Sequence, residues 1–517
     1  MGGGGTGAPA EGDKKGDEGL GGSKVEELDA VSRRLPPQPL GLMAKGSPID
    51  YSDTLLDCGI ADWSPMSKLI RIANGQGFWG DSIDAPVRLV EAGGIDYLTL
   101  DYLAEVTLSI MQKQRRKDAK LGYATDFVEL MARVLPQLKA KGIRVVANAG
   151  GVNPEACRAA VLEVAKNLGI TGLRIATVTG DDVLARLPEF QAKGLTLANM
   201  DTGEGLFDAP RYILSANVYL QTQAMVEALD TGADIVLTGR CTDPGLTLAP
   251  LIHEFKWAAD DWNRLAAGTV AGHILECGAQ STGGNFTRWW EVPDLWNVGY
   301  PIAECSEDGT FVVTKHEGTG GMVTVDTVSE QLVYEMGDPH HYITPDVVAD
   351  FTSIRLEQTG PDRVRVSGIS GKPRTPFLKV SGAYLKGYKA TGQLTLCGPR
   401  ALEKARLCAE IVWKRLAAAG FEYQHTDAEF LGASTVHAGI ARAPEDPAEI
   451  VLRLSVKDAD RNKVERFGRE IAPLVTAGPA GVTGFAGGRP KAQEIVAYWP
   501  ALLPRELVTW AVTVQEI

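Results

Sequence analysis

Short runs of aliphatic and β-branched residues alternate with amphipathic segments through the first half of the chain. The aliphatic runs predict buried strands at residues 68–74, 95–100, 144–150, 174–180 and 234–239. The segments between them place apolar residues at helical spacing, which predicts helices at residues 83–94, 123–141 and 154–168. Strands that alternate with helices indicate a mostly parallel sheet with helices on both faces, and ligands of such sheets bind at the carboxyl ends of the strands.

Beyond residue 270 the pattern changes to alternating apolar and polar residues between glycine turns, which is typical of antiparallel sheet with one wet face. A helix is expected at residues 399–416. The remaining pattern predicts a strand at 449–456, a helix at 462–475, a glycine-rich loop at 476–490 and a strand at 507–514. We therefore expect an α/β fold with a mostly parallel sheet and flanking helices. An antiparallel α+β region and a small C-terminal α+β unit should follow it.

Composition supports this globular organisation and suggests domain boundaries. Hydrophobic residues make up 44% of the chain and charged residues 23%, as in ordinary soluble proteins. The expected parts are an extended Gly/Pro-rich head at 1–66, an α/β domain at 67–268, a β-rich α+β domain at 269–418 and a small α+β unit at 419–517.

Charge and cysteine usage exclude several classes of protein. The formal net charge of −13 argues against a nucleic-acid partner, and no apolar run is long enough to span a membrane. The glycine-rich start has neither a secretory signal nor the pattern of a transit peptide. The seven cysteines form no C-x-x-C pair. We expect free thiols in a reducing compartment, and therefore a cytoplasmic protein.

The first predicted strand ends in a loop, Gly75-Gln-Gly77-Phe-Trp-Gly80, with the spacing of a dinucleotide-binding turn. The loop precedes a helix, and Asp101 follows about 20 residues later, as that motif requires. Two bulky aromatic residues in the loop and the charge of Asp81 at the helix start oppose a bound pyrophosphate. A tight turn in which Asp81 caps the helix is the alternative that we favour.

Polar side chains also follow the second and third strands. Asp101 and Glu105 are four residues apart, so they would share one face if the segment is helical. Two neighbouring carboxyl groups can divide general acid and base work, and a solvated or capping pair is the alternative. After the third strand, Asn148 is a candidate to bind a carboxylate or carbonyl, and Gly150 and Gly151 let backbone N–H groups turn toward a ligand.

The strand at 234–239 is followed by Arg240, Thr242 and Asp243. An arginine at the carboxyl edge of a sheet is a ready partner for a carboxylate or phosphate. Asp243 either contacts the ligand or holds Arg240 in place. Both interpretations remain open from the sequence.

Two later loops combine hydroxyl groups with glycine pairs, as backbone nests that hold anions do. The loops contribute Ser281, Thr282, Gly283, Gly284, Asn285 and Gly320. His316 lies beside a carboxylate in the second loop, which makes it the predicted acid–base histidine, with a structural histidine as the alternative. No metal site is predicted, because the His340–His341 pair lacks a third ligand at useful spacing.

Together these loops resemble the acyclic terpene utilisation protein A (AtuA) family. The matching segments are RIANGQGFWGDSIDAP, IDYLTLDYLAEVTLSIM, VVANAGGVNP, IVLTGRCTDPGL, STGGNF and GPAGVTGFAGGRPK, and the resemblance extends over residues 68–517. It implies a link to bacterial gene clusters that degrade citronellol and geraniol through branched acyl-CoA intermediates. It also makes a dehydrogenase less expected. The opening of a small ferredoxin-like module that accompanies some members does not occur in this sequence, so a separate small partner chain is one alternative.

The sequence thus predicts an oligomeric enzyme of small-carboxylate or acyl-CoA catabolism. Its chemistry would be hydration, isomerisation, lyase action or thioester hydrolysis, and the sequence requires no cofactor. The predicted catalytic residues are Asp81, Asp101, Glu105 and His316. The predicted ligand-binding residues are Gly77, Asn148, Gly150, Gly151, Arg240, Thr242, Asp243, Ser281, Thr282, Gly283, Gly284, Asn285 and Gly320. A Rossmann-like NAD(P)-dependent oxidoreductase and a non-catalytic subunit of a degradative complex are the alternatives.

Overall fold

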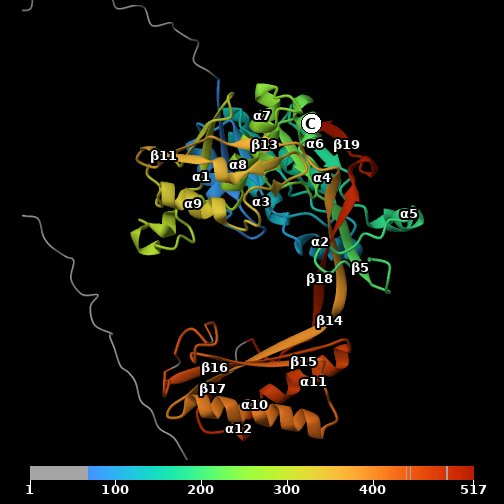
Figure 1. Ribbon diagram of the computed structural model, residues 1–517, viewed down its shortest axis with the longest axis vertical. Helices are drawn as coiled ribbons and strands as arrows, with labels where there is room; N and C mark the ends of the chain where they lie inside the picture. Colours follow the sequence, from blue (N-terminus) through green and yellow to red (C-terminus); the bar gives the residue numbers. More distant parts are fainter. Residues whose placement is uncertain (1–67, 438, 443, 485–486) are drawn as a thin grey trace, which may run out of the picture. The chain divides into compact units, whose positions relative to one another are not determined.

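The computed structural model describes residues 68–517, apart from residues 438, 443 and 485–486 (Figure 1). The glycine- and proline-rich head predicted for residues 1–66 lies outside the described residues. The described residues form a mixed α/β fold with a large, partly parallel sheet and a second, antiparallel sheet. The predicted α/β class is therefore confirmed.

The large sheet has ten strands, and its centre is parallel. The parallel strands, in spatial order, are β1 (Leu69–Gln76), β2 (Tyr97–Leu100), β3 (Arg144–Ala147), β6 (Ile235–Thr238) and β4 (Arg174–Thr179). Beyond β1 the sheet continues with antiparallel β7 (Ile302–Ser306), β8 (Phe311–Thr314), β12 (Arg363–Ser367) and β11 (Arg355–Gly360). Each of the five strands predicted in the first half of the chain corresponds to one of these parallel strands.

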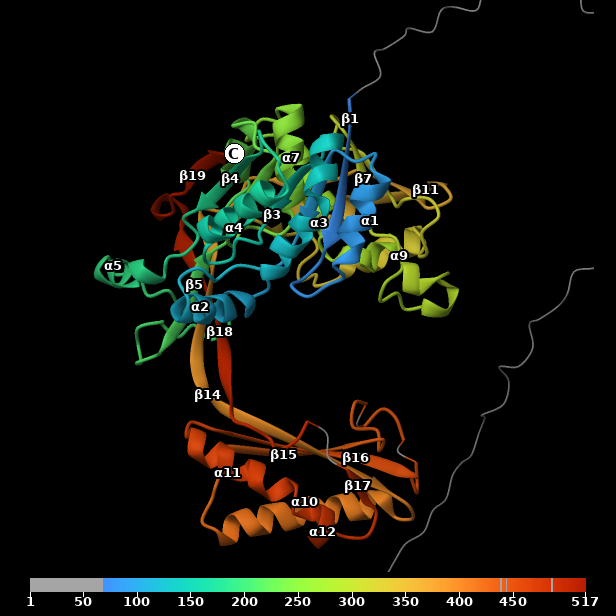
Figure 2. The same ribbon diagram turned by 180° about the vertical axis from the view of Figure 1, so that it is seen from behind.

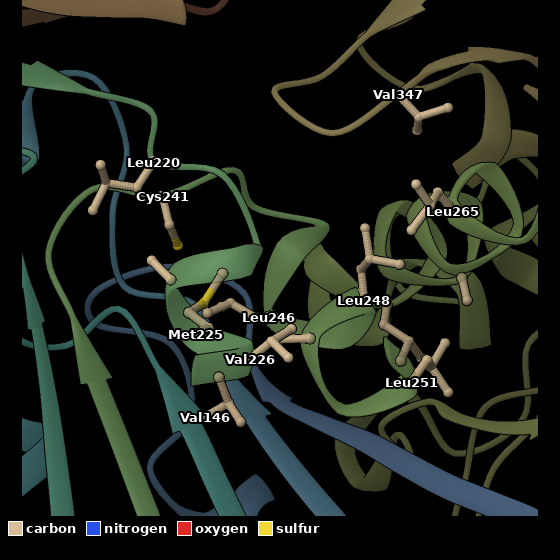
Figure 3. Packing of buried hydrophobic residues seen from close by; sticks show 14 of the residues in the cluster. Val146, Leu220, Met225, Val226, Cys241, Leu246, Leu248, Leu251, Leu265 and Val347 are labelled. Carbon is tan, nitrogen blue, oxygen red and sulfur yellow. The ribbon is translucent and has the colours of Figure 1, made fainter. Parts of the chain in front are cut away.

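Helices cover both faces of the parallel strands. One face packs against α1 (Asp84–Ala92), α3 (Thr125–Lys141) and α4 (Pro154–Asn167), which Figure 2 shows from that side. The other face packs against α6 (Gln223–Asp230), α7 (Gly245–Phe255) and α8 (Trp262–Glu276). Within β3, Val145 and Ala147 belong to the first core and Val146 to the second. Figure 3 shows Val146 close to Val226 and to Leu246 of α7. Burial on alternate faces explains why these strands are continuously apolar.

The last strand of the chain, β19 (Ala511–Glu516), pairs antiparallel with β4 at the edge of the large sheet. The sequence grouped this strand with the small C-terminal unit. Its place is fixed by the full backbone ladder to β4, and by a side-chain contact in which the hydroxyls of Thr177 and Thr513 lie 2.7 Å apart.

The second sheet is built around β14 (Phe377–Cys397). The first part of this strand pairs with β5 (Ile213–Val218) and with β18 (Gln493–Pro504). Its later part pairs with β16 (Glu449–Asp458), which in turn pairs with β15 (His425–Leu431), and with β17 (Val482–Gly484). The long alternating run beyond residue 370 therefore forms the antiparallel sheet that its pattern predicts.

The remaining elements are short or cover the second sheet. They are α2 (Thr107–Lys117), α5 (Leu187–Ala192), α9 (Val325–Val333), α10 (Ala401–Ala418), α11 (Arg461–Ile471), α12 (Leu474–Ala477), β9 (Tyr342–Ile343), β10 (Val348–Asp350) and β13 (Ser370–Lys372). Helices α10 and α11 share an apolar core with β14 and β16, which includes Leu394, Val412, Leu452 and Phe467. The helix predicted at 399–416 is confirmed as α10, and the one at 462–475 begins as α11.

A glycine allows α8 to approach the loop that precedes α7. A Cβ atom on Gly272 would lie 2.5 Å from Pro244 Cα and still closer to the Pro244 carbonyl oxygen. Both neighbours are backbone atoms, which cannot rotate away. The contact matters because this loop and the end of α8 both contribute to the pocket described below.

We expect Gly272→Ala to destabilise the protein by about 1–3 kcal/mol, since the added methyl group forces backbone apart in a packed core. Thermal unfolding of the purified variant measures the effect. Gly337→Ala is the matched control, because an added Cβ there meets nothing within 4 Å. Equal unfolding temperatures for the two variants would show that the approach of α8 is not tight.

Candidate functional site

A pocket of about 410 Å³ lies at the carboxyl ends of three parallel strands. Gly77 follows β1, Asp101 follows β2 and Arg240 follows β6, and all three line the pocket. The opposite wall comes from the end of α8, the turn at 280–285 and residues 334–335. This is the position at which ligands of open α/β sheets bind.

Asp101 is buried and firmly held. Its Oδ1 accepts hydrogen bonds from Asn148 Nδ2 at 2.6 Å and from the Leu103 N–H at 3.1 Å. Asn148 is oriented in turn by accepting the Tyr102 N–H at 2.6 Å. Burial and the charge of Asp243 raise the pKa of Asp101 well above its usual range, although Arg240 and Asn148 act in the other direction. Asp101 is therefore a carboxyl group that holds its proton to a higher pH than an ordinary aspartate does.

Glu105 reaches the same pocket from a loop. The helical segment considered for Asp101 and Glu105 does not form, because α2 begins only at Thr107. Tyr219 donates its hydroxyl to Glu105 Oε1 at 3.3 Å. Burial alone would raise the pKa of Glu105, but the backbone N–H of the residue, Arg240, Lys379 and Tyr219 outweigh burial and lower it. The pKa values of the two carboxyl groups thus move in opposite directions, as a division of acid and base work requires.

Arg240 is almost completely buried, and its side chain is engaged by the protein itself. Nη1 donates to Asp243 Oδ1 at 2.6 Å and to the Leu103 carbonyl at 2.8 Å, and Nη2 donates to Asp243 Oδ2 at 3.2 Å. The guanidinium also stacks 4.1 Å from the centre of the Tyr219 ring. Of the two interpretations left open by the sequence, the geometry favours Asp243 as the group that holds Arg240.

A second pocket of about 400 Å³ adjoins the first, and the two share Glu105, Asp243 and Glu335. Thr242, a predicted ligand-binding residue, lines this second pocket. Its other walls are largely apolar and include Met200, Tyr342, Ile343, Phe377, Leu378 and Leu502. Lys379 is the one basic residue among those that line it. The two pockets together offer a polar end and an apolar end.

The glycine loop after β1 is filled by its own aspartate. Asp81 Oδ2 accepts the Gly77 N–H at 3.0 Å, and its Oδ1 accepts the Ser82 N–H and the Tyr300 hydroxyl, each at 2.7 Å. A Cβ on Gly77 would lie 2.9 Å from the Cys277 carbonyl carbon. The aspartate thus takes the N–H groups that a pyrophosphate would need, which disfavours the dinucleotide site. Asp81 closes the turn but does not cap α1, because the N-cap position is Ile83 and no side chain caps the helix there. In the described part of the chain, Asp81 does not line the pocket of Asp101.

The structure does not bring His316 to Asp101, contrary to the predicted arrangement. His316 Nε2 lies 2.9 Å from the Gly93 carbonyl oxygen, to which it donates, and burial lowers the pKa of the ring. The histidine lines a separate pocket of about 280 Å³, together with Arg88 and Glu317. Gly320, in the same loop, donates its N–H to the Asn297 carbonyl.

The proposed nest at residues 281–284 does not offer free N–H groups. The Gly283 N–H donates to the Gln280 carbonyl at 3.2 Å, and the Gly284 N–H donates to the Ala279 carbonyl at 2.8 Å. Thr282 Oγ1 donates to the Gly299 carbonyl at 2.6 Å, and Ser281 is buried. Because these groups close a short 3₁₀ turn, the anion-binding interpretation of the loop lacks its donors. Asn285, by contrast, lines the pocket.

Gly150 and Gly151 allow neighbouring parts of the chain to pack closely against the loop after β3. A Cβ on Gly150 would lie 2.8 Å from both Pro154 Cβ and the Thr238 carbonyl oxygen, and one on Gly151 would collide with Met111. Their small size brings the loop after β3 close to β6 and α2. Asn148 is therefore the ligand candidate of this loop that remains beside the pocket, through its contact with Asp101.

Sequence reasoning missed three acidic or basic residues at the pocket. Glu276 lies at the end of α8, with His273 behind it, and Glu335 lines both pockets from the loop after α9. Glu335 adopts a left-handed backbone conformation with φ 53°, which is uncommon for a non-glycine residue and concentrates at functional sites. The i, i+3 spacing of His273 and Glu276 is the signal that a helical assignment would have exposed.

A protein-family model described as "Acyclic terpene utilisation family protein AtuA" matches residues 70–514. The chain belongs to the AtuA family. The resemblance drawn from the glycine loops is therefore confirmed, and membership indicates a protein related to terpene utilisation. No curated protein matches this AtuA family chain.

This AtuA family structure also lacks two features among its described residues. None of the helices in the described ranges is long and apolar enough to cross a membrane. Within the same ranges, no group of three or more histidine, cysteine, aspartate or glutamate side chains is arranged to hold a metal ion.

Since Asp81 occupies the phosphate position of the loop, we expect NAD and NADP to leave the unfolding temperature unchanged. A ligand present at 100 times its Kd would stabilise the protein by about 2.7 kcal/mol, so real binding would be visible in a thermal-shift assay. Inorganic phosphate at the same ionic strength is the control. A rise in unfolding temperature that increases with cofactor concentration would contradict a loop closed by Asp81.

Asp181 fixes the backbone of Arg240 through a hydrogen bond. Its Oδ2 accepts the Arg240 N–H and Asn217 Nδ2, each at 2.8 Å. Burial raises the pKa of Asp181 to about 7. The folded state therefore binds this proton more tightly than the unfolded state, where the pKa is about 3.9.

Stability from this group is present at low pH and is lost as the pH rises through about 7. At roughly 1.36 kcal/mol for each pH unit, the loss has an upper bound of about 4 kcal/mol. We expect Asp181→Asn to reduce the fall in unfolding free energy between about pH 5 and pH 8, because an amide oxygen accepts the same bonds without titrating. Denaturant unfolding across this range tests it, with exposed Asp201→Asn as control. An unchanged slope in Asp181→Asn would rule out the assignment.

Proposed function

We propose that this chain is an acid–base enzyme that acts on an apolar acyl compound. The observation that carries the proposal is Asp101, a buried carboxyl group at the carboxyl end of β2, with one oxygen held by Asn148 and the Leu103 N–H. Burial raises the pKa of such a group well above its usual range, so it can carry a proton and release it to a substrate atom inside the pocket. Its family membership, in a family named for acyclic terpene utilisation, agrees with an apolar substrate.

Glu105 supplies the complementary base. Its pKa is lowered, so it is ionised when Asp101 still holds its proton. In the proposed step, Glu105 removes a proton from the carbon next to an acyl carbonyl, and Asp101 gives its proton to the carbonyl oxygen. The product is the neutral enol, and both protons return in the reverse step. Isomerisation and dehydration next to a carbonyl begin with this step, and hydration and carbon–carbon cleavage pass through the same enol.

Charge favours an uncharged acyl group over a free carboxylate in the polar pocket. Five carboxyl groups line it, whereas its one arginine is already paired with Asp243. The five are Asp101, Glu105, Asp243, Glu276 and Glu335. A carboxylate of the substrate would meet the negative charge of the ionised carboxyl groups, Glu105 among them, at low dielectric, which raises its free energy. A thioester or ketone oxygen avoids this cost, and the apolar chain of the substrate would extend along Phe377 and Leu378 in the adjoining pocket.

Exchange of carbon-bound hydrogen tests the proposal without knowledge of the net reaction. The protein is incubated in deuterated water with a panel of linear and branched acyl-CoA thioesters and free acids, and mass spectrometry follows deuterium uptake. We expect uptake by at least one thioester, and a loss of roughly 100- to 10,000-fold in Asp101→Asn, because general acid catalysis contributes that much.

Glu163→Gln is the matched control, since this exposed residue of α4 lies away from the pocket. Exchange at the wild-type rate in Asp101→Asn would show that Asp101 does not move the proton. Absence of exchange with every compound, together with a stable partner on pulldown, would favour the non-catalytic subunit instead.

A further inference from the structure

The last turn of α8 carries a histidine and a glutamate that contact each other beside the pocket. His273 Nδ1 lies 3.0 Å from Glu276 Oε1, and His273 Nε2 lies 3.0 Å from the Gln331 carbonyl oxygen. The histidine side chain is 1% exposed. Gln331 donates its side-chain amide back to the His273 carbonyl at 2.9 Å, so the ring is fixed from both sides.

The partners of the ring determine where its protons lie. A backbone carbonyl only accepts hydrogen bonds, so Nε2 must carry a hydrogen to bond to Gln331. The contact between Nδ1 and Glu276 then contains one further proton. That proton resides either on the ring, which gives an ion pair, or on the carboxyl group, which gives a neutral pair. In both states the pair has no net charge, which lowers the free-energy cost of burying it.

The other oxygen of Glu276 is free to act. Oε2 is buried and has no hydrogen-bond partner among the described residues, and Glu276 lines the pocket that also contains Asp101 and Arg240. A buried carboxyl oxygen without a hydrogen-bond partner raises the free energy of the folded state, so its presence calls for an explanation such as a functional role. We infer that Glu276 is a second proton-transfer carboxyl group of this pocket and that His273 is the positioning residue that shares its proton. The inference rests on the proposed acid–base function.

The surroundings of Glu276 keep its proton available. Burial raises its pKa, His273 acts to lower it, and the negative charges of Asp243 and Glu335 raise it further. Cys277 follows it in the chain, and the Tyr342 hydroxyl lies 3.4 Å from His273 Nδ1. On the histidine, burial lowers the pKa, but Glu276 and the backbone carbonyl of Gln331 outweigh burial and raise it. The pair therefore retains its one shared proton to a higher pH than either group would alone.

Esterification by a small apolar diazo compound tests both parts of the inference. The reagent transfers its alkyl group to a protonated carboxyl and releases nitrogen, so it marks carboxyl groups that are both protonated and reachable from the pocket. Peptide mass spectrometry then locates the esters on the full-length protein at several pH values. At neutral pH we expect Glu276 to be labelled at least about threefold faster than exposed Glu163, since an ordinary glutamate has a pKa near 4.3.

The variant His273→Gln distinguishes a shared proton from a merely structural contact. Without the ring, burial and the neighbouring carboxylates act unopposed on Glu276, so its labelling should persist to higher pH. Labelling of Glu276 no faster than that of Glu163, or an identical pH profile in folded His273→Gln, would overturn the inference. Should His273→Gln fail to fold, ¹⁵N NMR of the histidine rings decides the same point in Glu276→Gln. There the His273 pKa must fall, and an unchanged pKa overturns the inference.

Deuterium exchange separates this inference from the proposed function. If an acyl compound exchanges, Glu276→Gln should slow the exchange by roughly 100-fold, as expected for loss of one acid–base group. Exchange at the wild-type rate in Glu276→Gln, with loss in Asp101→Asn, would overturn the role of Glu276 and leave that of Asp101. If no compound exchanges, the proposed function fails, and so does the catalytic part of the inference. The labelling experiment then tests only whether Glu276 and His273 share a proton.

Discussion

The guanidinium of Arg240 is a full positive charge that is almost completely withdrawn from water, and the loops around it are arranged to neutralise it. Leaving such a charge without its partner costs about 3–5 kcal/mol, a large part of the stability of a domain. Asp243 therefore takes both ends of the guanidinium, the Leu103 carbonyl takes a third N–H, and the Tyr219 ring covers one face. These three contacts come from separate segments of the chain. The contacts of Arg240 thus link the segments that follow β2, β5 and β6, and Asp181 holds the backbone of the arginine.

The acid–base character of the pocket follows from that arrangement. Asp243 is paired with Arg240 and its negative charge raises the pKa of Asp101, while burial raises the pKa of Asp243 itself. Glu105 lies where Arg240 and Lys379 both favour its charged form, so it ionises first. Different neighbours thus shift the pKa values of two carboxyl groups four residues apart in opposite directions. The distinction does not arise from their mutual repulsion, as the sequence alone suggested.

The sequence predicted what depends on local periodicity and missed what depends on contacts across the fold. Strands such as β3 and helices such as α3 were found because burial on fixed faces leaves a regular apolar pattern. Asp101 was found because its place after a strand is itself a signal of function. His316 was misplaced because its ring is committed to a carbonyl more than 200 residues away in the sequence, at Gly93. Glu276 was overlooked because α8 is buried nearly all round and so lacks an amphipathic pattern.

The contacts across the fold also change which chemical class of substrate is expected. From the sequence, Arg240 and the turn at 281–284 looked like an anion-binding pair, since arginines and glycine-rich turns are common partners of carboxylates. In the fold, Arg240 is paired with Asp243. The N–H groups of the turn donate to the carbonyls of Gln280 and Ala279. Most of the other ionisable side chains that line the pocket are carboxyl groups. A site that presents protonated carboxyl groups beside an apolar groove is suited to donate hydrogen bonds to a neutral carbonyl oxygen, because that oxygen gains negative charge only as the proton arrives.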